Sequence, residues 1–282
     1  MFIARGENET AIRANGLTLI TSQGQQIIYP AMVTSTPAQL HDLDLIICSV
    51  KSYDLETSME SLKPCTNDKT IVLPMLNGLD ASERIKKLLP NAEVWQGCAY
   101  IISRLIAPAV VKESGKINRL YFGAEQRRKE NLQRVEVLFK AAGINARLST
   151  NILQTLWEKF LFISPLATLT SYLDVSVGEI LSNQQHKKLL SNLLAEIKSL
   201  ADARNITLSE SIIQTTLDKI SSLPCEATSS MHSDFKKGGK TEVDSLTGYV
   251  VELGKELNVP TPDYEKMLFG LTEKSLKRVV GL

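Results

Sequence analysis

Two short, almost continuous apolar runs in the first half of the chain predict strands of a parallel sheet. Residues 43–50 read LDLIICSV and residues 70–73 read TIVL. Strands of this kind carry apolar side chains on both faces because helices cover both faces of such a sheet. Pro74 and then the pair Asn77-Gly78 follow the second run, and this pair favours turns because both residues tolerate positive φ. We therefore expect a strand that leads into a loop with functional side chains.

The rest of the first half continues as a mixture of strands and helix. Three stretches have the composition of strands, namely residues 94–112, 119–123 and 144–148. The polar segment 127–142 has the apolar spacing of an amphipathic helix. These patterns predict an α/β domain over residues 1–150.

From Asn151 onward the apolar spacing becomes helical. One stripe with spacings of three and four residues consists of Leu189, Leu190, Leu193, Leu194, Ile197, Leu200 and Ala201. The last helix that this spacing reveals carries Val243, Leu246, Val250, Leu253 and Leu257, and Pro260 and Pro262 follow it as helix-breaking residues. The second domain, residues 151–282, is therefore predicted to be mainly α-helical.

Composition fits two folded domains and argues against several kinds of partner. The 282 residues are 43% hydrophobic and 22% charged, with a formal net charge of +1, which favours neither nucleic acid nor a membrane surface. No stretch approaches the roughly 18 apolar residues of a membrane span, and the first residues do not read as a signal peptide. The four cysteines form no CxxC pair and are expected to be reduced and structural. We expect a cytoplasmic protein.

The start of the chain does not show the elements with which a dinucleotide-binding sheet begins. Such a sheet opens with a strand, a GxGxxG turn and a helix whose first backbone N–H groups hold the pyrophosphate. Residues 1–6 (MFIARG) instead resemble the end of the second strand. We therefore expect a Rossmann-like parallel-sheet domain that is missing its first strand and glycine-rich loop, followed by the helical domain. Arg5 then suits the 2′-phosphate of NADP, although a solvated surface charge is the alternative.

Five short motifs, in this order, resemble the ketopantoate reductase family, the 2-dehydropantoate 2-reductases. They are FIARGE (2–7), ICSVKSYD (47–54), LNGLD (76–80), LWEKFLF (156–162) and SSMHSDFKKGGKTEVDSLTGYVV (229–251). The resemblance spans nearly the whole chain. It implies NADPH-dependent reduction of 2-dehydropantoate to pantoate, a step toward pantothenate and coenzyme A, with the substrate in a cleft between the two domains.

The resemblance makes Lys159 the residue expected to donate a proton. Hydride delivery to a keto carbon leaves negative charge on the oxygen, and a nearby ammonium can stabilise that charge and protonate it. Lys159 lies off the centre of its helix's apolar stripe, and partly apolar surroundings would lower its pKa. The alternative is a lysine whose stem covers apolar surface while its charge reaches water.

Four further residues receive roles from the resemblance. Arg5 and Lys51 are expected around the 2′-phosphate of NADPH, and Asn77 beside the nicotinamide and the substrate. Glu242 is expected to accept a hydrogen bond from the primary hydroxyl of the substrate. Each also has an ordinary explanation: a solvated strand end for Lys51, turn chemistry for Asn77, and a favourable interaction with the helix dipole for Glu242.

Two serines complete the expected substrate contacts. Ser230 is expected to bind the substrate carboxylate through its hydroxyl, although serines also cap helices. Asp234 is expected to support the same loop. Many family members have an asparagine where this chain has Ile163; the neighbouring Ser164 can supply a polar group, but it points about 100° away around the helix. This departure leaves a different 2-keto acid open as the substrate.

The remaining expectations concern partners and rival functions. The three histidines lack metal-ligand spacing, so no metal site is expected. The expected ligands are NADP and a small 2-keto acid, and a homodimer is the assembly we consider. A rival hypothesis is a related 2-keto acid reductase. Another is a catalytically silent protein that binds a small acid or a partner, because a domain without its phosphate loop lacks its main pyrophosphate contacts.

Overall fold

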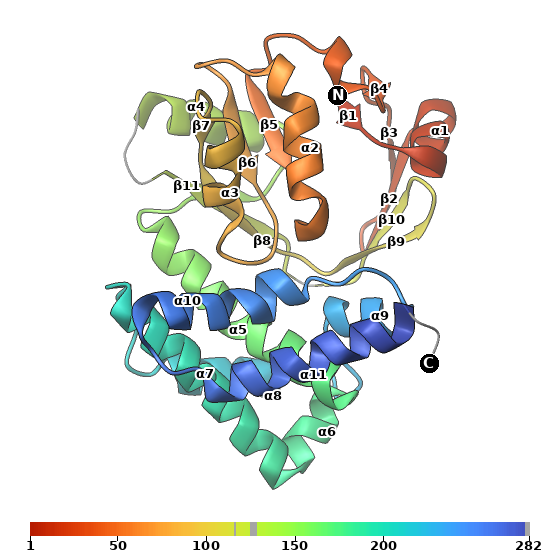
Figure 1. Cartoon of the computed structure of the whole chain (residues 1–282). Helices are drawn as coiled ribbons and strands as arrows, with labels where there is room; N and C mark the ends of the chain where they lie inside the picture. Colours follow the sequence, from red (N-terminus) through yellow and green to blue (C-terminus); the bar gives the residue numbers. More distant parts are fainter. Residues whose placement is uncertain (116, 125–128, 280–282) are drawn as a thin grey trace. The chain divides into compact units, whose positions relative to one another are not determined.

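The computed structural model describes residues 1–115, 117–124 and 129–279, which form two compact units (Figure 1). The α/β unit consists of Met1–Cys48, Glu56–Met75 and Ile85–Thr150. The helical unit consists of the chain from Asn151 onward together with two short segments, Ser49–Leu55 and Leu76–Arg84. Two segments from the first half of the sequence therefore belong structurally to the helical unit.

Parallel strands β5 (Leu45–Cys48), β6 (Ile71–Pro74) and β7 (Glu93–Val94) form one sheet of the α/β unit in that order. All four residues of β6 are buried, as the continuous apolar run predicts. The 3₁₀ turn Ser52–Asp54 and helix α2 (Leu55–Leu62) come after β5, and α3 (Ala81–Leu88) comes after β6. Both predicted strands are confirmed, with ends that differ from the sequence estimate by a few residues.

A second sheet carries the aromatic core of this unit. Its strands are β12 (Ala146–Leu148), β11 (Arg119–Gly123) and β8 (Gln96–Tyr100), and helix α4 (Lys129–Ala141) packs against it. Phe122 stacks with Trp95 at 6.0 Å between ring centroids and meets Phe139 edge-on at 5.4 Å. The predicted helix over 127–142 is thus present in the described part of the chain, while residues 127–128 lie outside it.

The remaining strands form two further small sheets. Strand β1 (Phe2–Ile3) pairs in parallel with β4 (Val33–Thr34) and leads through Arg5 into α1 (Gly6–Asn15). The other sheet has the order β3 (Gly24–Ile28), β2 (Leu17–Thr21), β10 (Val110–Glu113) and β9 (Ser103–Ala107). Parallel pairing recurs in all of these sheets, in agreement with the predicted Rossmann-like class.

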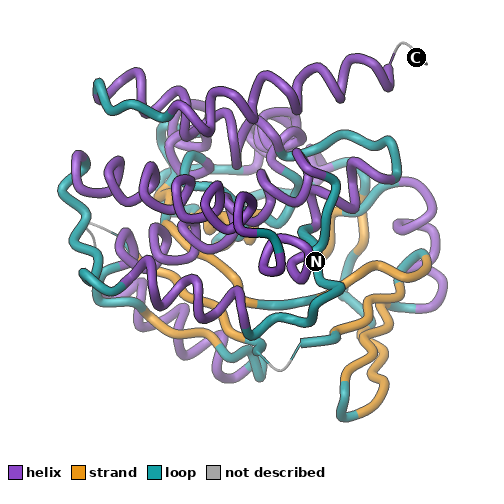
Figure 2. Tube along the Cα trace, turned by 90° about the horizontal axis from the view of Figure 1, so that it is seen from below, coloured by secondary structure: helices purple, strands orange, loops and turns teal. Residues whose placement is uncertain are grey.

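The second unit is built almost entirely of helices, drawn in purple in Figure 2. They are α5 (Ile152–Leu173), α6 (Val177–Ser182), α7 (Gln184–Ala203), α8 (Ile212–Ser221), α9 (Ser230–Lys236), α10 (Tyr249–Leu257) and α11 (Pro262–Val279). Asn151 caps α5 by accepting a hydrogen bond from the Gln154 backbone N–H. The stripe predicted on α7 is confirmed, because its residues from Leu190 to Ala201 are buried in the core of this unit.

Helix α11 corrects the expectation that the helical pattern ends before Pro260. Pro262 is the first residue of α11, a position where proline costs little because the first N–H groups of a helix have no partner inside it. Tyr264, Met267 and Leu271 follow at helical spacing and are buried in the core. The proline therefore starts a helix.

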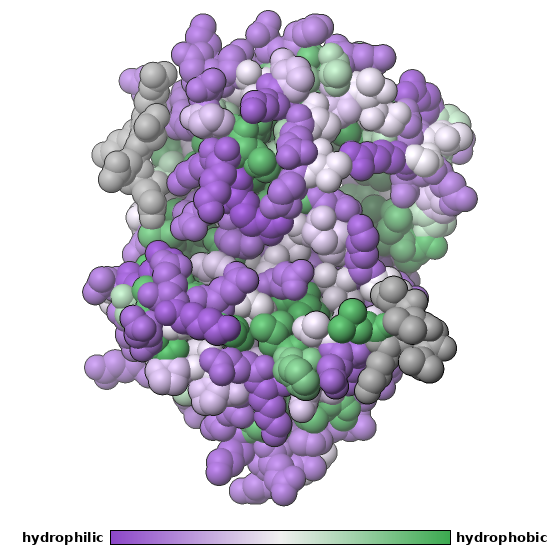
Figure 3. Space-filling model, viewed as in Figure 1, coloured by the Kyte–Doolittle hydropathy of each residue, from purple (hydrophilic) through white to green (hydrophobic). Residues whose placement is uncertain are grey.

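Hydrophilic side chains cover most of the face shown in Figure 3, with apolar side chains in smaller groups. This distribution is what amphipathic helices produce when their apolar stripes face inward. Among the described residues, no helix is both long and apolar enough to span a bilayer. Of the cysteines, Cys48, Cys65 and Cys98 are buried and Cys225 is exposed.

Candidate active site

The two segments that join the helical unit bring polar side chains with them. Ser49–Leu55 begins directly after β5 and carries Lys51, and Leu76–Arg84 begins two residues after β6 and carries Asn77. Ligand contacts in open α/β sheets come from such loops at the carboxyl ends of strands. The local sequence therefore delivers a cation and an amide to the unit that contains Lys159 and Glu242.

Lys159 lies on α5 and is only 7% exposed. Its ammonium Nζ donates a hydrogen bond to Oδ1 of Asn77 over 3.0 Å. Gly78, the next residue, has φ of +103°, and a side chain there would bring Cβ to 3.3 Å from the backbone oxygen of Ser245. Because Lys159 uses the amide oxygen, a ligand can receive a hydrogen bond from the NH₂ group of Asn77.

Glu242 is the second buried charge and is 3% exposed. Lys51 Nζ lies 3.3 Å from Glu242 Oε2 and 2.9 Å from Asp234 Oδ2, while the backbone N–H of Ser52 donates to Glu242 Oε1 over 3.4 Å. Desolvation by itself would lower the pKa of Lys51, but the hydrogen bond from its ammonium to Asp234 and the charge of Glu242 outweigh it and raise that pKa. The pairing keeps Lys51 charged and compensates the buried carboxylate.

Helix α5 is joined to the π-helical turn Asp244–Gly248, which begins two residues after Glu242. Ser164 Oγ donates to the backbone oxygen of Leu246 over 2.7 Å, and the hydroxyls of Thr168 and Thr247 lie 2.8 Å apart. These bonds fix the helix that carries Lys159 against the turn next to Glu242. The unit therefore holds an ammonium, an amide donor and a carboxylate acceptor, groups that can stabilise a developing oxyanion and anchor a hydroxyl.

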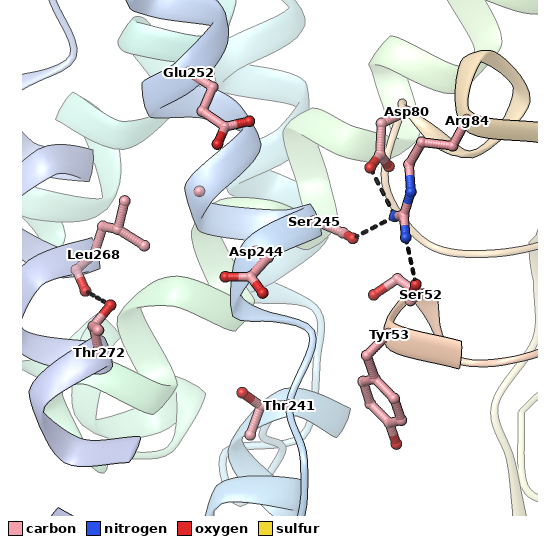
Figure 4. A pocket seen from close by; sticks show the side chains of 11 residues that line it. Ser52, Tyr53, Asp80, Arg84, Thr241, Asp244, Ser245, Glu252, Leu268 and Thr272 are labelled. Atoms are coloured by element: carbon pink, nitrogen blue, oxygen red, sulfur yellow. Dashed lines mark hydrogen bonds and ion pairs between the residues drawn. The ribbon is translucent and has the colours of Figure 1, made fainter. Parts of the chain in front are cut away.

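An open pocket of about 430 Å³ lies in the helical unit (Figure 4). Ser52, Asp80, Arg84 and Ser245 line it. Its lining also includes Thr241, the neighbour of Glu242, but neither Glu242 nor Lys159.

Comparison with known proteins agrees with the sequence motifs. Residues 1–127 match the family model described as "Ketopantoate reductase PanE/ApbA", and residues 151–274 match "Ketopantoate reductase PanE/ApbA C terminal". The crystal structure of 2-dehydropantoate 2-reductase from Porphyromonas gingivalis W83 is 33% identical, with a TM-score of 0.82 over 96% of this chain and 87% of that chain. The chain belongs to the ketopantoate reductase family.

Two more distant proteins show the breadth of the similarity. A 2-dehydropantoate 2-reductase from Halobacterium salinarum is 27% identical over 92% of this chain and 84% of its own length. The ternary structure of D-mandelate dehydrogenase with NADH and anilino(oxo)acetate has a TM-score of 0.86 at 22% identity, over 98% of this chain and 91% of that chain. The second likeness concerns the fold. The family is one of oxidoreductases, as the motifs suggested.

Within this ketopantoate reductase family member, Ser164 was expected to supply a polar group to the substrate, and the structure shows its hydroxyl bonded to other groups of the protein. Its side chain is 0% exposed, and its hydroxyl is shared between the backbone oxygen of Leu246 and the hydroxyl of Tyr264, 2.6 Å away. A hydroxyl has one proton to donate, and Ser164 gives it to the Leu246 oxygen, so Ser164 can meet the Tyr264 hydroxyl only as an acceptor. Ser164 joins α5 to its neighbours.

The other expected contacts lie on three different elements of the chain. Ser230 is exposed at the first residue of α9, and the N-cap of that helix is its neighbour Ser229, which accepts a hydrogen bond from the His232 N–H. Arg5 is exposed in the α/β unit at the N-cap position of α1. Lys51, expected at the cofactor phosphate, is bonded to Asp234 and Glu242. The structure thus brings together Lys159 with Asn77, and Lys51 with Glu242.

Two contributors escaped the sequence analysis. The Ser52 backbone N–H reaches Glu242, and no side-chain motif can reveal a backbone donor. Arg84 bonds to the Ser52 backbone oxygen over 2.7 Å. The spacing of four residues between Asp80 and Arg84 could have predicted their ion pair, because oppositely charged side chains at this spacing meet on one helix face.

We predict that Ser164→Ala lowers the free energy of unfolding by about 1–3 kcal/mol, since it removes the buried hydrogen bond to the Leu246 oxygen and one of the partners of the Tyr264 hydroxyl. Chemical denaturation measures the change. The double variant Ser164→Ala/Tyr264→Phe should recover part of the lost stability, because the buried Tyr264 hydroxyl that lost a partner is removed as well. A large rise in KM for a keto acid at unchanged stability would instead support substrate binding by Ser164.

Proposed function

We propose that the protein reduces 2-dehydropantoate to pantoate with NADPH, using Lys159 as the proton donor. The observation that supports this most directly is the partly buried hydrogen bond of 3.0 Å between Lys159 Nζ and Asn77 Oδ1. A buried ammonium held by an amide is oriented before a substrate arrives, and fixed donors of this kind stabilise a developing oxyanion far better than mobile ones in water.

In this proposal each residue of the site has a separate task. Lys159 donates a hydrogen bond to the keto oxygen and then its proton, so that the new hydroxyl is neutral. The NH₂ group of Asn77 donates to the substrate while its oxygen keeps Lys159 in place. Glu242, held by Lys51 and the Ser52 N–H, accepts from the primary hydroxyl of the substrate. Ser230 binds the substrate carboxylate.

A nicotinamide cofactor would supply the hydride when bound. The exposed guanidinium of Arg5, after β1, has the place and charge for a 2′-phosphate. The 282 residues contain no GxGxxG sequence, so pyrophosphate contacts of that type are not among those they supply. Lys51 contributes less than first expected to phosphate binding, because two carboxylates already neutralise it.

A second candidate is reduction of another 2-keto acid. Ile163 occupies the position where many family members have an asparagine, and an apolar side chain cannot replace its hydrogen bonds. The similarity in fold to D-mandelate dehydrogenase makes an aromatic 2-keto acid a reasonable member of a substrate panel.

The test is the rate of NADPH oxidation with ketopantoate, pyruvate and benzoylformate, repeated with NADH. We expect the highest kcat/KM with ketopantoate and NADPH. A preference for benzoylformate would favour the second candidate. Failure to oxidise either cofactor with any of the three acids would contradict both and favour a catalytically silent binding protein.

A further inference from the structure

The guanidinium of Arg84 connects three segments of the helical unit (Figure 4). Nη2 donates to the backbone oxygen of Ser52 over 2.7 Å, and Nη1 lies 2.9 Å from Asp80 Oδ2 and 3.5 Å from Ser245 Oγ. The side chain is 24% exposed, so most of it is removed from water. Partly buried, charge-assisted hydrogen bonds to several acceptors are stronger and more directional than a surface ion pair.

Each segment that Arg84 touches carries, or adjoins, a residue of the proposed site. Ser52 is 3% exposed, its own N–H donates to Glu242, and its neighbour Lys51 pairs with the same carboxylate. Ser245 comes three residues after Glu242. The segment Leu76–Arg84, which includes Asp80 and Arg84, also carries Asn77, the partner of Lys159.

We propose that Arg84 is a positioning residue for the reaction: through the Ser52 backbone oxygen it holds the segment that orients Glu242. The expected effect of Arg84 on turnover rests on the proposed function, the reduction of ketopantoate. Arg84 does not contact the substrate in this account. Its task is to keep Ser52 N–H and Lys51 at the carboxylate while Asp80 fixes the guanidinium from the other side.

The hydrogen bonds that Arg84 makes to Ser52 and Asp80 require a guanidinium. Its planar fork reaches a backbone oxygen and a carboxylate at the same time, whereas a lysine ammonium is a compact charge on a flexible stem. Arg84 also lines the open pocket of about 430 Å³. A small guanidinium ion added to Arg84→Ala can therefore enter from solvent and occupy the vacated place.

The activity test compares Arg84→Ala and Arg84→Lys with the wild-type chain. We expect kcat/KM for ketopantoate to fall by roughly tenfold to hundredfold in both variants, the range of one charge-assisted hydrogen bond. Methylguanidinium at a concentration that leaves the circular dichroism unchanged should restore at least part of the activity of Arg84→Ala, and methylammonium should not. Equal restoration by both cations would overturn the proposal.

Arg204→Ala is the matched control, since Arg204 makes a surface ion pair with Glu256 over 3.2 Å in the same unit. This variant should keep kcat/KM within about twofold of the wild-type value, because exposed ion pairs contribute little to the stability of the fold. Wild-type-like kinetics in Arg84→Ala would refute the positioning role.

Hydrogen exchange tests the same role without turnover. We expect backbone amides of Ser49–Leu55 to exchange about tenfold faster in Arg84→Ala and at the wild-type rate in Arg204→Ala. Unchanged exchange in Arg84→Ala would overturn the proposal even if the chain reduces ketopantoate. If the wild-type chain shows no reductase activity, the proposed function fails, and the exchange rates still decide whether Arg84 holds this segment.

Discussion

Lys159→Ala is expected to lower kcat for ketopantoate by about 10²–10⁴-fold, the range associated with loss of a general acid. Lys159 is 7% exposed and bonded to Asn77, so water does not readily take its place. KM should change much less than kcat, because the lost interaction strengthens as negative charge develops on the keto oxygen. Steady-state NADPH oxidation measures both constants.

Lys274→Ala provides a matched control for Lys159→Ala. Lys274 is another partly buried lysine of the helical unit, and its ammonium donates to the backbone oxygens of Ser171 and Tyr172. Its loss should lower thermal stability while kcat stays near the wild-type value. Equal kcat in Lys159→Ala and the wild type would show that Lys159 takes no part in the chemistry. An equal fall of kcat in Lys159→Ala and Lys274→Ala would show that the loss of activity comes from impaired folding.

The second large effect is expected for Glu242→Gln. The amide keeps the size of the side chain but loses the charge, and kcat/KM for ketopantoate should fall roughly tenfold to 150-fold, corresponding to ~1.5–3 kcal/mol for a charge-assisted hydrogen bond. We expect most of the change in KM, because the substrate hydroxyl is held in both the ground state and the transition state.

Asp234→Asn separates the substrate contact from the ion pair. Asp234 is the other carboxylate partner of Lys51, at 2.9 Å, and is 24% exposed. If Glu242 acts on substrate, its variant should lose far more activity than Asp234→Asn. Equal losses would mean that both carboxylates serve only to hold Lys51.

Strong periodic signals predicted most of the fold. The apolar stripe on α7 and the continuous run of β6 both reflect burial, which sequence spacing records directly. Helix α11 was missed because its start at Pro262 was read as a stop, although proline suits both places. The assignment of Ser49–Leu55 to the helical unit depends on contacts distant in sequence, and no local pattern encodes it.

The sequence indicated several residues of the candidate site but not the contacts between them. The motifs indicated Lys159 and Asn77 separately, and the structure joins them by a hydrogen bond. Helical direction alone did not reveal that Tyr264 and Leu246 meet the hydroxyl of Ser164. The pairing of Lys51 with Glu242, 191 residues apart, was equally hidden, since each had been given a different ligand.

The most direct test of the account is a crystal structure of the protein with pantoate and NADP. We expect Lys159 Nζ within about 3.2 Å of the hydroxyl oxygen formed by reduction, and Glu242 within hydrogen-bond distance of the primary hydroxyl of the same pantoate molecule. Pantoate bound away from Lys159, or in contact with only one of the two residues, would contradict the claim that they serve one substrate.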